Sequence, residues 1–141
     1  MVIVKADKKS EAGVLPDEEL LAEMGKFNED LAKAGVLLAG EGLQASSKGA
    51  RVRFEGAKRT VIHGPFSETK ELIAGFWLWQ AKSKEEAIEW LKRAPFKEGE
   101  LEIRQVFELE DFPTDPAEKP DGWREKEQRF REEQQKKAAR P

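Results

Sequence analysis

Apolar and polar positions along the chain predict strands and helices in alternation. The chain opens with an apolar run over residues 1–6, which has the length of a buried strand. From Leu20 to Ala34 apolar residues recur every three or four positions, after Asp17 as a good N-cap and before Gly35 as a C-terminal stop. This spacing predicts a helix with one apolar face, followed by a second strand over residues 36–39.

The second half of the chain continues this alternation. Strict alternation or short apolar runs predict four more strands, at residues 51–55, 59–63, 76–81 and 101–109. Ser83 and Glu86 form a capping-box pattern at the start of a second helix, whose apolar face continues to Leu91. The predicted order has helices after the first and fifth strands. We therefore expect an α+β fold, with both helices on one face of a mainly antiparallel sheet.

The predicted strand at residues 76–81 is apolar on both faces. Phe76 and Leu78 point to one side, while Trp77 and Trp79 point to the other. Two helices can cover only one face, and exposed tryptophans would form an apolar patch of the kind that marks an interface or a ligand site. We therefore expect either a cleft roofed by the two indoles or a homodimer with face-to-face sheets, burying at least about 1,000 Å² in total.

The end of the chain differs in composition from the rest. From Pro113 to Pro141 there are eight basic and seven acidic residues, and the only large apolar residues are Trp123 and Phe130. We expect one domain over residues 1–112 and a charged C-terminal extension over 113–141. The extension should be irregular to Gly122 and then helical to about residue 137, with its two aromatic residues as anchors. A frayed polar tail is the alternative.

Composition excludes several kinds of chemistry. The 141 residues include no cysteine and one histidine, so disulfides, thiolate metal centres and multi-histidine sites are excluded. The formal net charge of −3 argues against nucleic acid as a partner. There is no apolar run of about 18 residues and no signal-peptide pattern, so we expect a cytoplasmic protein without a membrane span.

One motif is misleading. Residues 40–45 read G-x-G-x-x-A directly after a predicted strand, which is the pattern of a dinucleotide-binding turn. That turn binds the pyrophosphate at the N-terminus of a following helix. Here residues 46–50 lead into another strand, so we reject dinucleotide binding. Nothing in the chain implies a metal or redox cofactor.

The segment HGPFSETKE, from His63 to Glu71, is the densest cluster of chemically active side chains. It follows a predicted strand, and Gly64-Pro65 forces a turn there. An imidazole can donate and accept a proton near neutral pH, and loops on a rigid sheet are where functional groups usually lie. The alternative is an ordinary charged surface loop whose polar groups cap its own turn.

Four segments together resemble one protein family. GEGLQ at residues 40–44, HGPFSETKE, a Gly-Phe-Trp strand and SKEEAIEWLKRAP at residues 83–95 are similar to the DGPF branch of the YCII-related proteins. The resemblance covers residues 1 to about 110. Ser67 stands where the family motif DGPFAETKE has Ala, and His63 stands where it has Asp. The resemblance implies a ferredoxin-like subunit in a dimeric α/β barrel, which agrees with the strand that is apolar on both faces.

The resemblance also suggests a function. Related proteins are suspected enzymes, with a His–Asp pair in a cleft, and a dehydrochlorinase of aromatic degradation looks related. We therefore expect a small cofactor-independent enzyme that moves protons on a small organic molecule beside the HGPFSETKE loop. The alternative is a non-catalytic binding or regulatory module, because DGPF proteins are also linked with extracytoplasmic-function sigma factors.

The candidate site residues follow from this hypothesis. His63, with Glu68 or Glu41 as its carboxylate partner, is the candidate proton-transfer group. Residues that would bind the ligand are Phe66, Lys70, Trp77, Trp79 and Arg53. Arg53 shares a strand face with Arg51, and together they would hold an anion. A solvated strand face is the alternative for the two arginines.

Overall fold

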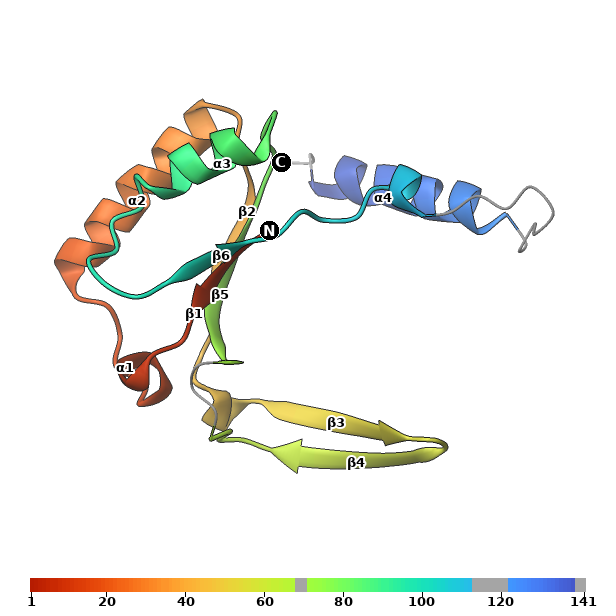
Figure 1. Cartoon of the computed structure of the whole chain (residues 1–141), viewed down its shortest axis with the longest axis horizontal. Coiled ribbons are helices and arrows are strands. Elements are labelled where there is room, and N and C mark those ends of the chain that lie inside the picture. The colour runs from red at the N-terminus through yellow and green to blue at the C-terminus, as the bar shows by residue number, and fades with distance from the viewer. Residues whose placement is uncertain (68–70, 113–121, 139–141) are drawn as a thin grey trace. The chain divides into compact units, whose positions relative to one another are not determined.

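The structure is a computed structural model that describes residues 1–67, 71–112 and 122–138. The chain forms two compact units, Met1–Gln105 and Val106–Pro141, each described by itself below. The strands are β1 (Val2–Lys5), β2 (Leu37–Gly42), β3 (Ala50–Glu55), β4 (Lys58–His63), β5 (Ile73–Trp79) and β6 (Leu101–Ile103) (Figure 1). The helices are α1 (Lys8–Glu11), α2 (Glu18–Lys33), α3 (Lys84–Leu91) and α4 (Trp123–Ala138), with 3₁₀ turns η1 (Ser46–Lys48) and η3 (Leu109–Asp111).

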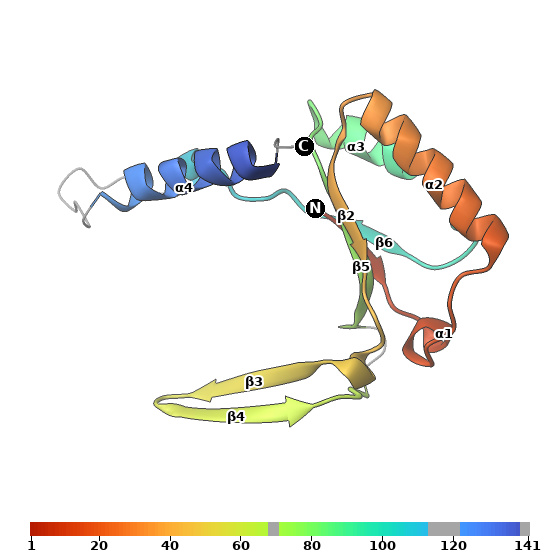
Figure 2. The same ribbon diagram turned by 180° about the vertical axis from the view of Figure 1, so that it is seen from behind.

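Four strands form an antiparallel sheet in the order β2-β5-β1-β6. Helices α2 and α3 lie on one side of this sheet (Figure 2). A strand–helix–strand unit followed by a second one, with the strands interleaved in this order, is the ferredoxin-like arrangement. The α+β prediction is therefore confirmed.

Helix α2 forms where the spacing predicted it. The Asp17 side chain accepts a hydrogen bond from the Leu20 N–H at 2.8 Å, which satisfies one of the free donors of the first turn. Gly35 follows the last turn with φ of +72°, a left-handed conformation that favours glycine. The buried face of this helix carries Phe27 and Leu31.

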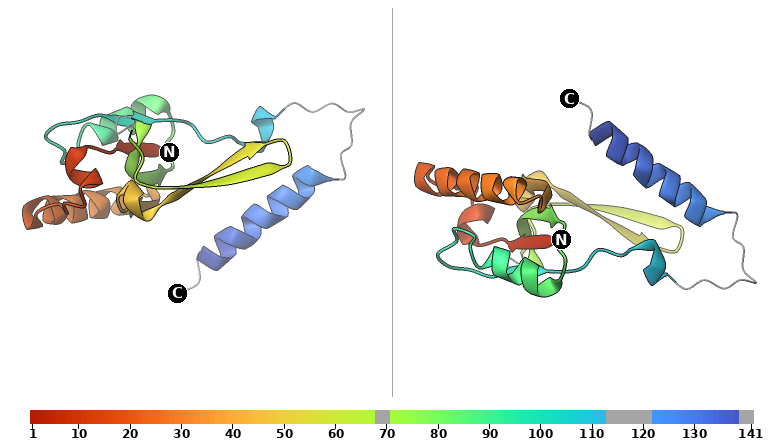
Figure 3. Two further views of the ribbon diagram at one scale, coloured as in Figure 1. Left: turned by 90° about the horizontal axis from the view of Figure 1, so that it is seen from below. Right: turned by 90° about the horizontal axis from the view of Figure 1, so that it is seen from above.

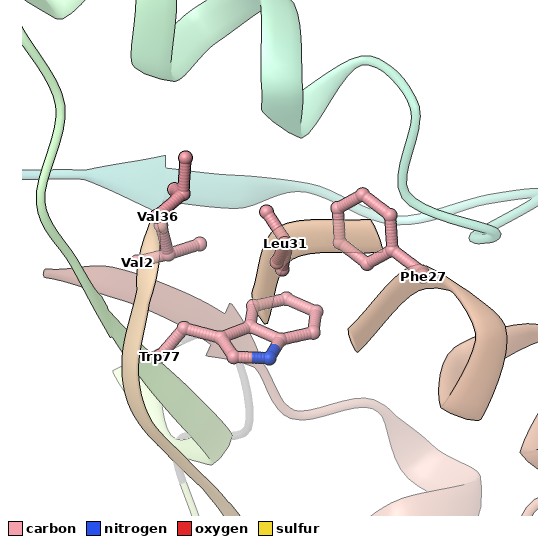
Figure 4. Packing of buried hydrophobic residues seen from close by; sticks show 5 residues of the cluster. All are labelled: Val2, Phe27, Leu31, Val36 and Trp77. Atoms are coloured by element: carbon pink, nitrogen blue, oxygen red, sulfur yellow. The ribbon is translucent and has the colours of Figure 1, made fainter. Parts of the chain in front are cut away.

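The core lies between the sheet and α2. It is formed by Val2, Phe27, Leu31, Val36 and Trp77, shown in Figure 4. Trp77 meets Phe27 edge to face, with 5.7 Å between ring centroids, and its Nε1–H donates to Asn28 Oδ1 at 2.9 Å. Trp79 also packs on Phe27, at 6.2 Å. This aromatic cluster fixes α2 against β5.

The two faces of β5 are therefore assigned opposite to our expectation. Trp77 is only 5% exposed, and it lies under the helices together with Trp79. Phe76 and Leu78, which alternate with them, belong to the open face. The physical reason is size: the indoles fill the space between sheet and helix, where large apolar groups gain most from burial. The apolar second face exists, but Phe76 and Leu78 form it.

The predicted third and fourth strands leave the main sheet. β3 and β4 pair only with each other, from Ala50 opposite His63 to Glu55 opposite Lys58. Gly56, with φ of +57°, supplies the left-handed residue that the tight turn requires. The hairpin projects from one end of the sheet on the side away from the helices (Figures 1 to 3). We call it the β3–β4 arm.

The last strand is shorter than predicted. Only Leu101–Ile103 is strand, and these residues pair with Val4, Ile3 and Val2 of the short strand β1. A final backbone hydrogen bond joins the Arg104 N–H to the Met1 carbonyl at 2.9 Å. The alternating pattern continued to Leu109, but alternation alone cannot supply a neighbouring strand for Val106 and Phe107.

The second unit contains the predicted C-terminal helix. α4 begins at Trp123, as expected, and Trp123 packs edge to face on Phe112 at 5.7 Å. Phe112 in turn contacts Phe107 at 5.2 Å. Phe130, the other predicted anchor, is 56% exposed, so the helix is held within this unit through its first turn. Residues 113–121, predicted to be irregular, lie outside the described residues.

Candidate functional site

The HGPF segment is held tightly against the η1 turn. The Gly64–Pro65 peptide bond is cis, and the Gly64 N–H donates to the Gly49 carbonyl at 3.0 Å. A Cβ atom on Gly64 would lie 1.8 Å from the carbonyl oxygen of Ser46. Only a residue without a side chain fits there, which fixes how closely the loop approaches the turn.

Ser46 joins this loop to a third segment. Its Oγ accepts a hydrogen bond from the Phe66 N–H at 3.0 Å and donates one to Glu11 Oε2 at 2.5 Å. Its own backbone N–H donates to Glu11 Oε1 at 3.0 Å. Both carboxylate oxygens of Glu11 are therefore used to hold η1, and η1 holds the loop. We call Glu11, Ser46 and Phe66 the anchor cluster.

Helix α1 places Glu11. It is a single turn with a capping box, in which the Asp7 side chain accepts from the Ser10 N–H at 2.7 Å and Ser10 Oγ accepts from the Asp7 N–H at 2.9 Å. The hydrogen bond from the Ser10 backbone holds the pKa of Asp7 below its ordinary value. The caps stabilise a turn too short to form by propensity alone, and Glu11 is its last residue.

Phe66 has a second contact on its ring. The Arg51 guanidinium carbon lies 3.9 Å from the ring centroid, a cation–π distance. Phe66 is therefore tied through its backbone to Ser46 and through its ring to β3. The predicted binding residue is fixed on two sides before any ligand arrives.

His63 ends β4 and begins the loop. It pairs with Ala50, and the alternation of the hairpin puts it on the same face as Val52, Phe54 and Val61. The imidazole is exposed, and within the described part of the chain it has no hydrogen-bond partner. Arg51 and Arg53 lie on the opposite face of the β3–β4 arm, so the structure does not bring Arg53 to His63.

The other predicted residues are spread over the sheet. Glu41 lies in β2, within the strand and not in a turn as expected, and it pairs with Phe76 on the open face. Trp77 and Trp79 belong to the core on the helix side. Glu68 and Lys70 lie outside the described residues, as does any contact that they make.

The main surface hollows lie elsewhere. Within the described ranges, the two best-formed hollows border α3 and β6, and neither includes a predicted site residue. Ile88, Leu91, Leu101 and Ile103 line the larger one. Among the residues described, no three acidic or histidine side chains form a group able to hold a metal ion. Within these same ranges, no helix is long and apolar enough to cross a membrane.

Sequence reasoning missed the anchor cluster. Glu11 and Ser46 lie 35 residues apart, and neither belongs to the HGPF motif. The only signal available was Asp7 followed three residues later by Ser10, a pattern that predicts a helix start but gives no hint of what its last residue touches.

The anchor cluster leads to a first prediction. Ser46→Ala removes the hydroxyl that bridges Glu11 and the Phe66 N–H, and it leaves that part-buried N–H without its acceptor. We expect a loss of about 1–3 kcal/mol in the free energy of unfolding, measured by urea denaturation. Ser47→Ala is the matched control, because Ser47 is exposed in the same turn; it should change stability by less than about 0.5 kcal/mol. Equal effects would contradict the anchoring role.

Two comparisons with known proteins bear on this site. The family model for the YCII-related domain matches residues 1–110. An uncharacterized protein, R00369, of Rhizobium meliloti (strain 1021) is 30% identical over 93 residues, covering 64% of this chain and 75% of that protein. The matched region includes β1 to β6, the arm and the HGPF loop.

Proposed function

The chain belongs to the YCII-related family, and we propose that it binds a small organic molecule beside the HGPFSETKE loop and transfers protons on it through His63. The observation that carries this proposal is the anchor cluster. Three hydrogen bonds join Glu11, Ser46 and Phe66, and Gly64 packs so closely that no side chain would fit. A loop held this firmly is a preorganised place for functional groups.

Each residue has a chemical role in this proposal. His63 is the general acid or base, since an imidazole changes protonation near neutral pH. Glu41 or Glu68 is the carboxylate that stabilises the charged imidazole. Phe66 and Lys70 contact the ligand, and the Arg51 guanidinium stacked on Phe66 favours a ligand with a negative charge. The chemistry proposed needs no metal or redox cofactor.

We also propose that the functional form is a homodimer. Ile3, Phe76 and Leu78 lie on the face of the sheet that no helix covers in the described part of Met1–Gln105. An uncovered apolar sheet face is typical of a protein interface. The second copy would pack its own sheet against this face.

One observation favours a second candidate function. His63 is exposed, and it has no hydrogen-bond partner within residues 1–67, 71–112 and 122–138. A catalytic imidazole is usually oriented by a partner inside a concave site. A non-catalytic ligand-binding or regulatory module would leave it as it is seen here, so binding and turnover must be measured separately.

Substitutions at His63 test the proposed function. The first step is a thermal-shift screen with small aromatic and aliphatic carboxylic acids; a true ligand at one hundred times its dissociation constant stabilises the fold by about 2.7 kcal/mol. With that compound, His63→Asn should reduce turnover by roughly 10²–10⁴-fold, because the amide cannot cycle a proton. Stability should change little, since the side chain is exposed.

Two further variants complete this test. His63→Asp introduces the residue of the family motif and should retain part of the turnover. Ser67→Ala, an exposed change in the same loop, is the matched control and should behave as wild type. If His63→Asn and His63→Asp both match wild type, His63 is not the proton-transfer group. Binding without any turnover in the wild-type protein would favour the non-catalytic module.

A further inference from the structure

The β3–β4 arm has one strongly apolar face that is open to solvent. Val52, Phe54 and Val61 are 49%, 68% and 57% exposed, and the strand pairing puts all three on one face. The other face differs at its base, where Arg51 covers the ring of Phe66. Three exposed large apolar side chains on a two-stranded ribbon are unfavourable in water, because a lone hairpin is marginally stable.

The reach of the arm suggests what covers this face. Its strands are six residues long, or about 20 Å at roughly 3.3 Å per residue. It projects on the side of the open sheet face, away from the helices (Figures 1 and 2). Two packed sheets lie about 10 Å apart. An arm of this length therefore extends beyond the plane of a second sheet packed on the first.

The area of the open face supports the same conclusion. Four short strands about 4.8 Å apart present a flat face of only roughly 300 Å². A stable interface of standard size buries about 800 Å² on each partner. The sheet face alone is too small, and two exchanged arms would add the missing area.

Charge complementarity points to a second copy of the chain as the occupant. Residues 50–63 carry four basic side chains and one acidic, whereas the remainder of residues 1–112 carries 13 basic and 20 acidic. On the open face Glu41 and Glu102 flank the apolar centre formed by Ile3 and Phe76. A basic arm and an acidic body attract each other between copies.

We propose that the β3–β4 arm of each protomer crosses to a second copy of the chain, and that the His63 site is built from both copies. His63 lies on the same face of the arm as Val52 and Val61, so burial of that face on the partner subunit also covers the imidazole. The absence of a concave site around His63 in the described part of a single chain then has a physical cause: the partner supplies its other wall. This inference rests on the proposed function in assigning His63 to the site.

Two adjacent substitutions on opposite faces of the arm test the proposal. Val61→Glu puts a charge on the apolar face, and Thr60→Glu puts the same charge on the other face. Both replace a β-branched residue. Sedimentation velocity over a range of concentrations should show a dimeric wild type, at least a tenfold rise in the dimer dissociation constant for Val61→Glu, and a change within about threefold for Thr60→Glu.

His63 provides a second readout that needs no ligand. It is the only histidine, so its ring signals in an NMR spectrum need no assignment. These signals should move when the wild-type protein is diluted from dimer to monomer. Val61→Glu should show the monomer signals at concentrations where the wild type and Thr60→Glu show the dimer signals.

The outcomes separate the two proposals. A monomeric wild type, equal effects of the two substitutions on association, or unchanged His63 signals on dissociation would each overturn the exchanged arm. None of these results depends on turnover, which the His63 variants test separately. If Val61→Glu unfolds the arm, as judged by circular dichroism, Phe54→Ser removes an apolar contact without adding a charge, and it should weaken the dimer in the same direction.

Discussion

Replacing Trp77 by alanine is expected to destabilise the Met1–Gln105 unit by about 3–5 kcal/mol. The indole is 5% exposed and packs against Phe27, Trp79 and Phe96, so its removal leaves a cavity between the sheet and α2. The change also takes away the donor to Asn28 Oδ1. Since small domains have a total stability of about 5–15 kcal/mol, much of the fold's margin would be lost. Urea denaturation followed by circular dichroism measures the effect.

Phe76→Ala is the matched control, because Phe76 is the next residue of β5 and points to the open face. At low protein concentration its truncation should cost much less than that of Trp77. At high concentration its cost should grow if the open face is covered in a dimer, whereas the cost of Trp77→Ala should be the same at both concentrations. A larger low-concentration loss for Phe76→Ala than for Trp77→Ala would show that the two faces of β5 are wrongly assigned.

This pair of residues also shows how far the sequence predicts the fold. Periodicity located β1, α2 and α3 closely, since caps such as Asp17 and Ser83 act within a few residues of their helices. The same periodicity showed that β5 is apolar on both faces. It could not say which face the helices cover, because the alternation of Phe76 and Trp77 is symmetric. The choice depends on α2, which presents Phe27 and Asn28 from nearly 50 residues away.

Pairing between strands is the second limit. The strands at β3 and β4 were predicted from their own residues, but their departure from the main sheet was not. Val52 and Phe54 alternate with arginines just as a strand of the main sheet would, with one wet face. Only the spatial order β2-β5-β1-β6, in which β5 takes the place beside β2, excludes them.

The candidate site divides in the same way. The motif from His63 to Glu71 was visible as a cluster, and its position at a strand end was correct. Its support from Glu11 and Ser46 was invisible, since hydrogen bonds between distant segments leave no periodic trace. The family resemblance was carried by residues such as Gly64 and Pro65, and the structure gives Gly64 a physical reason: backbone of η1 occupies the space where a side chain would lie.

Gly64→Ala is therefore expected to displace the HGPF loop. Its Cβ would lie 1.8 Å from the Ser46 carbonyl oxygen and 2.6 Å from the carbonyl carbon, so backbone must move and no rotamer change can relieve the contact. We expect a loss of about 1–3 kcal/mol in the free energy of unfolding, as for other overpacked sites. The displacement should also weaken the hydrogen bond from the Phe66 N–H to Ser46 Oγ, which amide hydrogen exchange at Phe66 would detect as faster exchange.

Gly49→Ala controls for this prediction at the same carbonyl. A Cβ on Gly49 would lie 3.5 Å from the Ser46 oxygen, an ordinary van der Waals distance, and Gly49 has an extended backbone with φ of −108°. This variant should keep both the stability and the slow exchange of the Phe66 amide. If Gly64→Ala behaves like Gly49→Ala, the loop is not held against η1, and the anchor cluster loses its role in positioning His63. If only Gly64→Ala also abolishes binding of a small carboxylic acid found by the thermal-shift screen, the fixed loop and the proposed site are one structure.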